Sequence, residues 1–338
     1  MKKKTVSNEL GIALKSATDD VAMDRVLKIQ EKYAKLEREV KALRRDRDDM
    51  LSEYSDIKNA RKFEVSTAVS RRDGGGSKVR VCAGDFHGMM TDKQAVAAFV
   101  ADVKRLDPDE VVIGGDLVEC GGWLAKHQPI GFIALCDYSY QEDIAAANCI
   151  LDEIQKAAPN AVVHYLEGNH EDRMERWIVD QVMSNKRDAE FLVELVSPRS
   201  LLKLKERGIS YYRRSEIYGK GLPRGWIKLG KMFFTHSLTY SANAARDAAA
   251  KTAGNVTYFC THREDSATIV YPEIGIVKAF NPGCMSLMQP VWKHSNPTSW
   301  SQGYGIDFIA QSGNFQRIHV PIWRGESLAG NMIERFKS

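Results

Sequence analysis

Five separated segments of the chain carry side chains that bind divalent metal ions. Three of them each follow a short run rich in β-branched residues, and these are Gly84-Asp85-Phe86-His87-Gly88, Gly114-Gly115-Asp116-Leu117-Val118-Glu119 and Glu167-Gly168-Asn169-His170-Glu171. The other two segments contain His236 and Cys260-Thr261-His262. Carboxylate, imidazole and amide groups together form a ligand set suited to Mn, Fe or Zn rather than to Ca or Mg alone. These segments therefore predict a metal site, provided that the fold brings them together.

The elements that would bring them together follow a βαβ pattern. Strands are predicted at 79–82, 111–113 and 162–166, and helices near 92–106 and 141–157. Because ligands of an α/β sheet gather beyond the carboxyl ends of its strands, the first three segments are expected to meet in one crevice. Later strands are predicted at 231–235, 256–260, 305–310 and 314–322, with fewer helices between them, so the second half is expected to be more antiparallel.

Four glycines lie where the predicted strands end, and they are Gly84, Gly114, Gly115 and Gly168. Glycine lets the backbone turn sharply, so these positions are expected to turn the ligands inward. Any one of the segments alone could occur by chance in a loop. Their ordered recurrence at successive strand ends strengthens the prediction.

A carboxylate in such a site can bridge two metal ions about 3.5–4 Å apart. A metal pair of this kind generates hydroxide at neutral pH and neutralises charge on a transferring phosphoryl group. The residues therefore predict hydrolysis of a phosphate ester by a metal-bound hydroxide, without a covalent intermediate.

With these residues in this order, the chain resembles the calcineurin-like metallophosphoesterase family. The family pattern is D-x-H, then G-D-x-x-(D/E), G-N-H-(D/E), an isolated His and G-H-x-H, and the resemblance covers about residues 79–322. The phage-type members are the most similar, through Gly168 to Arg173, Thr235-His236-Ser237, Cys260-Thr261-His262-Arg263 and Asn281-Pro282-Gly283-Cys284. The resemblance implies a four-layer α/β/β/α sandwich.

The resemblance also implies two groups of metal ligands that share Asp116 as a bridge. The ligands of the first metal would be Asp85, His87 and His262, and those of the second would be Asn169, His236 and Cys260. The implied cofactors are two divalent ions, with Mn expected first and Fe or Zn as alternatives.

Three further residues receive roles from the same resemblance. His170 would be the general acid that protonates the leaving oxygen, and imidazole suits this role because its pKa lies near neutral. Arg173 and Arg263 would hold phosphate oxygens by forked hydrogen bonds.

The chain departs from the family pattern at one place. Where the family has G-H-x-H, this sequence has Phe259-Cys260-Thr261-His262, so both the Gly and the first His are replaced. A thiolate at Cys260 can bind Zn or Fe. Alternatively, Cys260 is a packed apolar residue, and the second metal has a weakened ligand shell or is absent.

The N-terminal part carries a different pattern. From Ala22 to Ile57 the apolar residues recur at alternating steps of three and four, and charged residues fill the other faces. This heptad pattern predicts a coiled-coil helix that self-associates, and the alternative is an amphipathic helix lying on its own domain. Residues 70–78 contain three glycines and predict a linker. The expected organisation is a helical segment at 1–69, a linker at 70–78 and a metallophosphoesterase domain at 79–338.

Composition sets wider limits. The 338 residues carry a net charge of only +4, which permits a polyanionic partner but does not demand one. Six irregularly spaced cysteines predict reduced thiols and a cytoplasmic protein. No apolar run approaches the roughly 20 residues that span a bilayer, so no membrane partner is expected.

The expected substrate is a phosphodiester in DNA, which makes the chain a nuclease. The phage-type resemblance favours it, as do the basic residues Arg213, Arg214, Lys220, Arg224 and Lys228. One alternative is a phosphomonoesterase acting on proteins or nucleotides. Another is a non-catalytic DNA-binding or assembly protein with a degenerate metal site.

Overall fold

The computed structural model describes Asp24 and residues 26–42, 44–45, 77–125, 137–182, 186–290, 297–327 and 329. The chain divides into two compact units, Met1–Glu64 and Val65–Ser338. Only residues 77 and 78 of the predicted linker are described, so the predicted domain boundaries stay predictions.

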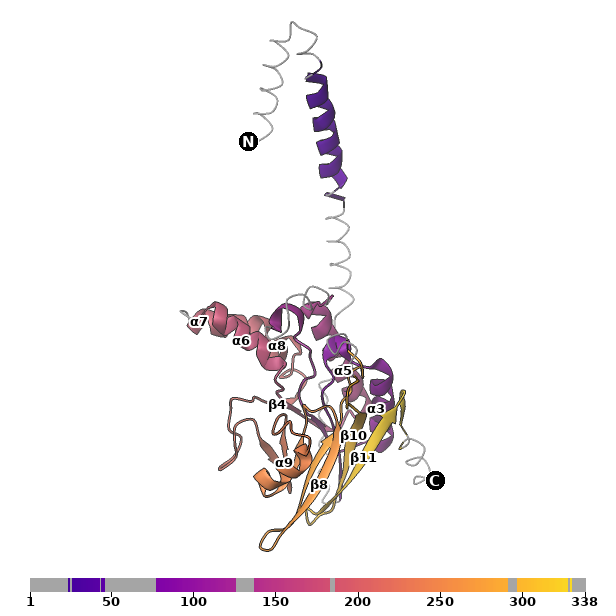
Figure 1. The fold of residues 1–338 in the computed structure, drawn as a ribbon, viewed down its shortest axis with the longest axis vertical. Coiled ribbons are helices and arrows are strands. Elements are labelled where there is room, and N and C mark those ends of the chain that lie inside the picture. Colours follow the sequence, from indigo (N-terminus) through magenta and orange to yellow (C-terminus); the bar gives the residue numbers. More distant parts are fainter. Residues whose placement is uncertain are drawn as a thin grey trace. The chain divides into compact units, whose positions relative to one another are not determined.

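Two β-sheets form the frame of the second unit (Figure 1). The seven-stranded sheet has the order β12-β11-β10-β1-β2-β3-β4, and its strands are β1 (Lys78–Ala83), β2 (Glu110–Ile113), β3 (Val162–Leu166), β4 (Ser210–Tyr212), β10 (Gln302–Ile309), β11 (Phe315–Trp323) and β12 (Glu326–Ser327). The five-stranded sheet has the order β5-β6-β7-β9-β8, and its strands are β5 (Ile227–Leu229), β6 (Met232–Thr235), β7 (Asn255–Tyr258), β8 (Glu264–Tyr271) and β9 (Gly275–Pro282).

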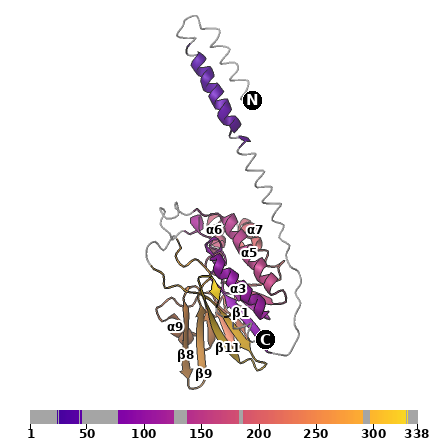
Figure 2. The ribbon, with the colours of Figure 1, turned by 90° about the vertical axis from the view of Figure 1, so that its right-hand side faces the viewer.

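Helices lie outside the sheets (Figure 2). They are α3 (Lys93–Leu106), α5 (Tyr140–Ala157), α6 (Glu171–Gln181), α7 (Lys186–Val196), α8 (Pro198–Leu201) and α9 (Ala244–Thr252), with 3-10 turns η1 (Gly88–Met90) and η2 (Gly122–Leu124). Side-chain caps explain two of the starts. Asp92 accepts from the N–H groups of Gln94 and Ala95 at the start of α3, and Ser139 accepts from that of Glu142 at the start of α5. The two helices predicted from the sequence are confirmed.

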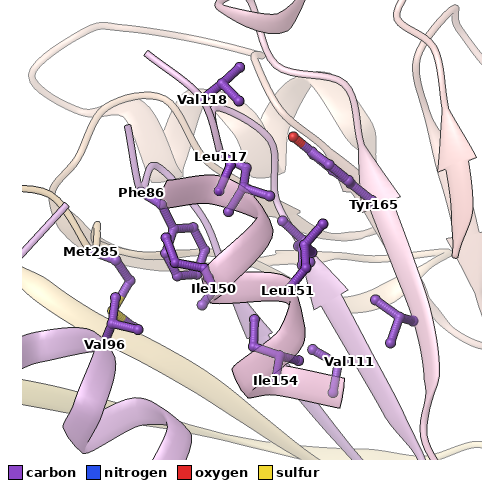
Figure 3. Close-up of a cluster of buried hydrophobic side chains, with 14 of the residues drawn as sticks. Phe86, Val96, Val111, Leu117, Val118, Ile150, Leu151, Ile154, Tyr165 and Met285 are labelled. Carbon is purple, nitrogen blue, oxygen red and sulfur yellow. The ribbon is translucent and has the colours of Figure 1, made fainter. Parts of the chain in front are cut away.

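Alternating side chains divide the first sheet between two cores. Val81 and Ala83 of β1 pack with side chains of α3 and α5, and Figure 3 shows Leu151 and Ile154 of α5 in this cluster with Val111 of β2. Cys82, between them, packs on the opposite face with the second sheet. Successive residues of a strand point to opposite faces, so β1 separates a helix layer from the second sheet.

Helix α9 completes the layers on the far side of the second sheet. Its four buried alanines pack against β7 and β9, and these alanines are Ala244, Ala245, Ala248 and Ala249. The layers of the second unit thus run helix, sheet, sheet, helix. The predicted α/β/β/α sandwich is confirmed.

The predicted strands are present, with shifted ends. The strand predicted at 256–260 ends at Tyr258, because Cys260 has a left-handed backbone (φ 71°) that a strand cannot continue. The β8–β9 hairpin was not predicted. The second half is more antiparallel, as expected: β10, β11 and β12 pair antiparallel, as do β5 with β6 and β8 with β9, and among the described strands after β4 only β6, β7 and β9 run parallel.

The described part of the N-terminal unit is helical over residues 26–42. Large apolar side chains of the predicted seam are 41–50% exposed, and they are Ile29, Tyr33, Leu36 and Val40. Most of the rest of the predicted seam lies outside the described residues, and the coiled coil stays a prediction. None of the helices among the described residues is long and apolar enough to cross a membrane.

Phe259 fills the space that two glycines leave between the sheets. Its ring is fully buried, and a Cβ added at Gly84 or Gly114 would lie 2.7 or 2.4 Å from ring atoms. Only Gly115, of the four glycines expected to make sharp turns, has a positive φ (96°). Gly84 and Gly114 are therefore required for close approach of the ring, which corrects the sequence-based expectation.

We expect Gly114→Ala to lower the free energy of unfolding by about 1–3 kcal/mol, because the new methyl group overpacks the core against Phe259. In a Phe259→Ala background the same change should cost much less, since the ring is gone. Urea unfolding of the four proteins in this double-mutant cycle measures the coupling. Additive losses would contradict the proposed contact.

Candidate metal centre

The five predicted segments converge at the carboxyl ends of neighbouring parallel strands. Loops after β1, β2 and β3 meet at one edge of the first sheet, and loops after β6 and β7 meet at one edge of the second. Backbone hydrogen bonds join them: the Asp85 N–H donates to the Gly115 carbonyl (3.0 Å), and the Phe259 N–H donates to the His236 carbonyl (2.9 Å). The Cys260 N–H then donates to the Asp85 carboxylate (2.9 Å), which links the two sets of loops.

Two groups of buried or half-buried donors lie side by side at this junction, and Asp116 belongs to both. The first group is Asp85, His87, Asp116 and His262, and the second is Asp116, His236 and Cys260. Within each group the ligand atoms all lie within 4.8 Å of one another. Each group could hold a metal ion, and the shared carboxylate stands where a bridging ligand would.

In the second group, three atoms with lone pairs lie close together. Nδ1 of His236 donates to the Gly114 carbonyl (2.7 Å), so Nε2 carries the lone pair in the neutral ring. That nitrogen faces Oδ2 of Asp116 at 3.2 Å and Oδ1 of Asn169 at 3.1 Å. Burial opposes the charged form of His236, but the Asp116 carboxylate outweighs it and raises the pKa of His236 well above its usual range, so without a metal a proton on Nε2 lies between these acceptors. A metal ion could take the place of that proton, so the donor set fits a metal ion.

The first group shows the same demand for a cation. Nδ1 of His87 is held by Oε2 of Glu119 at 2.7 Å, and Nε2 of His87 faces Nε2 of His262 at 3.0 Å. Oδ1 of Asp85 and Nδ1 of His262 are buried and have no hydrogen-bond partner among the described residues. A buried carboxylate oxygen without a donor is costly, and a metal ion would satisfy it.

The protonation of the first group reflects this crowding. Burial raises the pKa of Asp85 to about 7. Burial opposes the charged form of His87, but the Glu119 carboxylate outweighs it and raises the pKa of His87 to about 9. Burial and the neighbouring His87 hold the pKa of His262 well below its usual range. A metal ion entering this group therefore displaces protons.

Five of the candidate ligands have a left-handed backbone, and these are Asp85 (φ 54°), His87 (φ 61°), Asp116 (φ 48°), Cys260 (φ 71°) and His262 (φ 56°). Such conformations cost on the order of 1–3 kcal/mol each and persist only where surrounding structure holds them. The left-handed backbone of these residues turns their side chains inward at the strand ends. The sequence-based expectation had assigned this role to the glycines.

The carboxylate of Glu171, at the start of α6, holds two of the loops. Its Oε1 accepts from the N–H of Leu117 (2.7 Å) and the hydroxyl of Tyr165 (2.7 Å). Its Oε2 accepts from the N–H groups of Asp116 (3.0 Å) and Gly168 (2.8 Å). The loops after β2 and β3 are thus tied together through one buried side chain.

His170 lies at the edge of the donor groups. Its Nδ1 donates to the Glu119 carbonyl (2.6 Å), and its Nε2 lies 3.7 Å from Oδ2 of Asp116. Nη2 of Arg173 donates to that Nε2 (2.8 Å), while Nη1 donates to the carbonyls of Glu119 and Cys120. Both residues therefore adjoin the candidate metal positions, and their assigned roles stay predictions.

Arg263 is engaged elsewhere. Its Nη2 donates to the carbonyls of Ser241 (3.4 Å) and Ala242 (3.2 Å) and lies 3.7 Å from Asp265. None of these contacts involves a donor of the two groups. The predicted phosphate contact of Arg263 stays a prediction.

Sequence reasoning did not assign roles to Glu171 and Asp143, which position the loops. Asp143 accepts from the N–H groups of Glu119 and Cys120 (3.1 and 2.8 Å), and it is fully buried. The sequence did carry a sign of the role of Asp143, because this acidic residue lies four positions before the buried Ala147, on the apolar face of α5. An acidic residue at such a position needs polar partners, which marks it as structurally important.

Comparison with known proteins finds only distant similarity. No protein-family model matches the sequence, and no curated protein is significantly similar to it. Among solved structures, the chain is similar to a single mutant of Vps29 from Entamoeba histolytica (12% identity, TM-score 0.36, 74% of this chain and 95% of that chain). Vacuolar Protein Sorting 29 from Cryptosporidium parvum (8%, 0.37, 75% and 95%) and Vps29 from Chaetomium thermophilum (9%, 0.31, 72% and 97%) are similar too. At these TM-scores the matches say nothing about activity.

Glu171→Gln should loosen the centre, because an amide NH2 would then face backbone donors. We expect the free energy of unfolding to fall by about 1–3 kcal/mol and the affinity for metal to fall with it. Urea unfolding and metal titration measure the two effects. The same change at the exposed Glu206 is the control, and equal behaviour of the two variants would refute the role of Glu171.

Proposed function

We propose that the chain is a metal-dependent phosphodiesterase of the calcineurin-like class, acting on DNA. The observation that carries the proposal is Asp116, one carboxylate shared by two donor groups, with His170 beside it at 3.7 Å. Two divalent ions bound there, with Mn expected first, would activate water at neutral pH and neutralise the charge of the phosphoryl group. The order of motifs, which resembles the phage-type members, supports the same class.

In this proposal the residues of the chain divide the work. Asp85, His87 and His262 would hold one ion, Asn169, His236 and Cys260 would hold the other, and Asp116 belongs to both groups. His170, protonated on both nitrogens, would deliver the Nε2 proton to the leaving oxygen while its Nδ1–H donates to the Glu119 carbonyl.

Arg173 must release His170 for this step. Its Nη1 stays on the carbonyls of Glu119 and Cys120, and its Nη2, now on His170, would turn to a phosphate oxygen. The arrival of the phosphate would thereby free Nε2 to take up a proton from solvent, and the resulting imidazolium would be the acid.

A recess beside His236 favours a substrate with more than one phosphate. This cavity has a volume of about 330 Å³, and Arg214 and Arg224 line it together with Asp172. A second cavity of about 440 Å³ shares Asp172 and Ser215 with it and is lined by Trp177. Two guanidinium groups next to the candidate centre suit the neighbouring phosphates of a polynucleotide.

The proposal is tested with the chain loaded with Mn alone and with Mn and Zn together, on p-nitrophenyl phosphate, bis(p-nitrophenyl) phosphate, and linear and circular DNA. We expect both diesters to be cleaved and the monoester to react poorly. His170→Ala should lower kcat on DNA by about 10²–10⁴. It should cost far less on the p-nitrophenyl diester, whose leaving group needs no proton.

Cleavage of the monoester alone would make the chain a phosphomonoesterase. Bound metal without cleavage of any of these substrates would favour the non-catalytic alternative.

Replacement of both Arg214 and Arg224 by alanine tests the proposed contacts with DNA phosphates. KM for DNA should rise, and the salt dependence of DNA binding should lose about one unit of slope for each arginine removed. Lys156→Ala, on the exposed face of α5, is the matched control.

The N-terminal helix is the proposed means of self-association. Its seam residues Ile29, Tyr33, Leu36 and Val40 are large, apolar and 41–50% exposed, which suits packing against a second copy.

Leu36→Lys should shift the chain toward the monomer mass of 38.0 kDa in sedimentation experiments, because it places a charge in the seam. Leu27 is exposed and lies outside the seam, so Leu27→Lys is the control and should keep the oligomer. A monomeric wild-type chain would exclude self-association.

A further inference from the structure

Cys260 differs from the other cysteines that the structure describes. Cys82, Cys120 and Cys284 are buried, and burial raises the pKa of each thiol. Cys149 is exposed on α5, and Cys260 is half-buried at the candidate centre. Cys260 is therefore not a packed core residue, which was one of the two alternatives left open by the sequence.

The sulfur of Cys260 makes two polar contacts. The thiol donates to Oδ1 of Asn169 (3.1 Å), and the hydroxyl of Tyr240 lies 3.6 Å away. The same Oδ1 of Asn169 lies 3.1 Å from Nε2 of His236, so sulfur, amide oxygen and imidazole surround one point. Asp116 supplies the fourth atom, at 3.2 Å from the same nitrogen.

Several constraints fix this orientation. The left-handed backbone of Cys260 (φ 71°) turns the residue out of the strand direction. Its N–H is held by the carboxylate of Asp85, a residue 175 positions away. On one side the buried ring of Phe259 anchors the loop between the sheets. The backbone angle, the hydrogen bond to Asp85 and the packing of Phe259 together hold the backbone of Cys260, and its sulfur lies at the centre.

The two donor groups are chemically unequal. The first offers only carboxylate and imidazole, from Asp85, His87, Asp116 and His262. The second offers a carboxylate, an imidazole, an amide oxygen and a thiol. Soft sulfur ligands favour Zn, Fe and Co over Mn and Mg, whereas oxygen ligands suit Mn and Mg.

We propose that Cys260 binds the second ion as a thiolate and makes that position selective for a thiophilic metal such as Zn²⁺ or Fe²⁺, while the first position accepts Mn²⁺. On binding, a metal–sulfur bond forms, the S–H bond breaks and its proton passes to solvent, with no change of oxidation state. The inference rests on the proposed function in one respect, namely that the centre holds metal.

Cobalt(II) is the probe, because a thiolate ligand gives it a sulfur-to-metal charge-transfer band in the near ultraviolet. The full chain, freed of metal, is titrated with Co²⁺. We expect the band to appear in the wild type and in Cys149→Ser, and to vanish in Cys260→Ser and Cys260→His.

Competition between metals gives a second readout. In the wild type, Zn²⁺ should displace Mn²⁺ from one position and leave the other. In Cys260→His the preference of that position for Zn²⁺ over Mn²⁺ should fall by about tenfold or more, the size of effect that altered surroundings of a protein-bound metal produce. Bound metal is counted directly, so neither readout depends on activity.

The outcomes separate this inference from the proposed function. Two bound Co²⁺ ions with no charge-transfer band, or an unchanged preference in Cys260→His, would overturn the thiolate ligand and leave the phosphodiesterase proposal standing. A band that depends on Cys260, in a chain that cleaves no phosphate ester, would support the ligand and overturn the activity. Failure to bind any metal would overturn both.

Discussion

The loops that carry the candidate ligands depend on one buried carboxylate. Glu171 accepts hydrogen bonds from the backbone of the loop after β2, from the loop after β3 and from Tyr165. Burying a charge is expensive unless donors surround it, and here the donors are the Tyr165 hydroxyl and main-chain N–H groups of loops, which have no partner in a strand. The donors offset only part of the cost, because burial and the neighbouring Asp116 carboxylate still raise the pKa of Glu171. The position of Asp116, which both donor groups share, follows from this arrangement.

The two apolar cores supply the rigid support around that arrangement. The helix-side core fixes the first sheet from outside, and the core between the sheets fixes the distance across which the loops must meet. Left-handed ligands such as Asp85 and His262 hold their conformation only against such support. Asn281 also stabilises this loop, because its side-chain amide donates to the hydroxyl of Thr261, the residue between Cys260 and His262.

The sequence was sufficient for the layers and for the convergence of the segments, because both follow from strand periodicity and from the rule that parallel strands end at one edge. It could not show how Cys260 is oriented, since that depends on a hydrogen bond to Asp85 and on a backbone angle. Glu171 belonged to a motif, but its role needs the donors of distant loops to be visible. The β8–β9 hairpin was missed because β8 begins with charged residues and exposes alternate side chains.

The ring of Phe259 also limits how this loop could be exchanged. A graft carrying the glycine and histidine of the G-H-x-H pattern would remove the ring and leave a void bordered by Gly84 and Gly114. Cys82, Val112 and Phe234 belong to the same apolar cluster as the ring, and an apolar void stays dry. A successful transplant would need to refill that void, so Phe259, Gly84 and Gly114 form one unit for protein engineering.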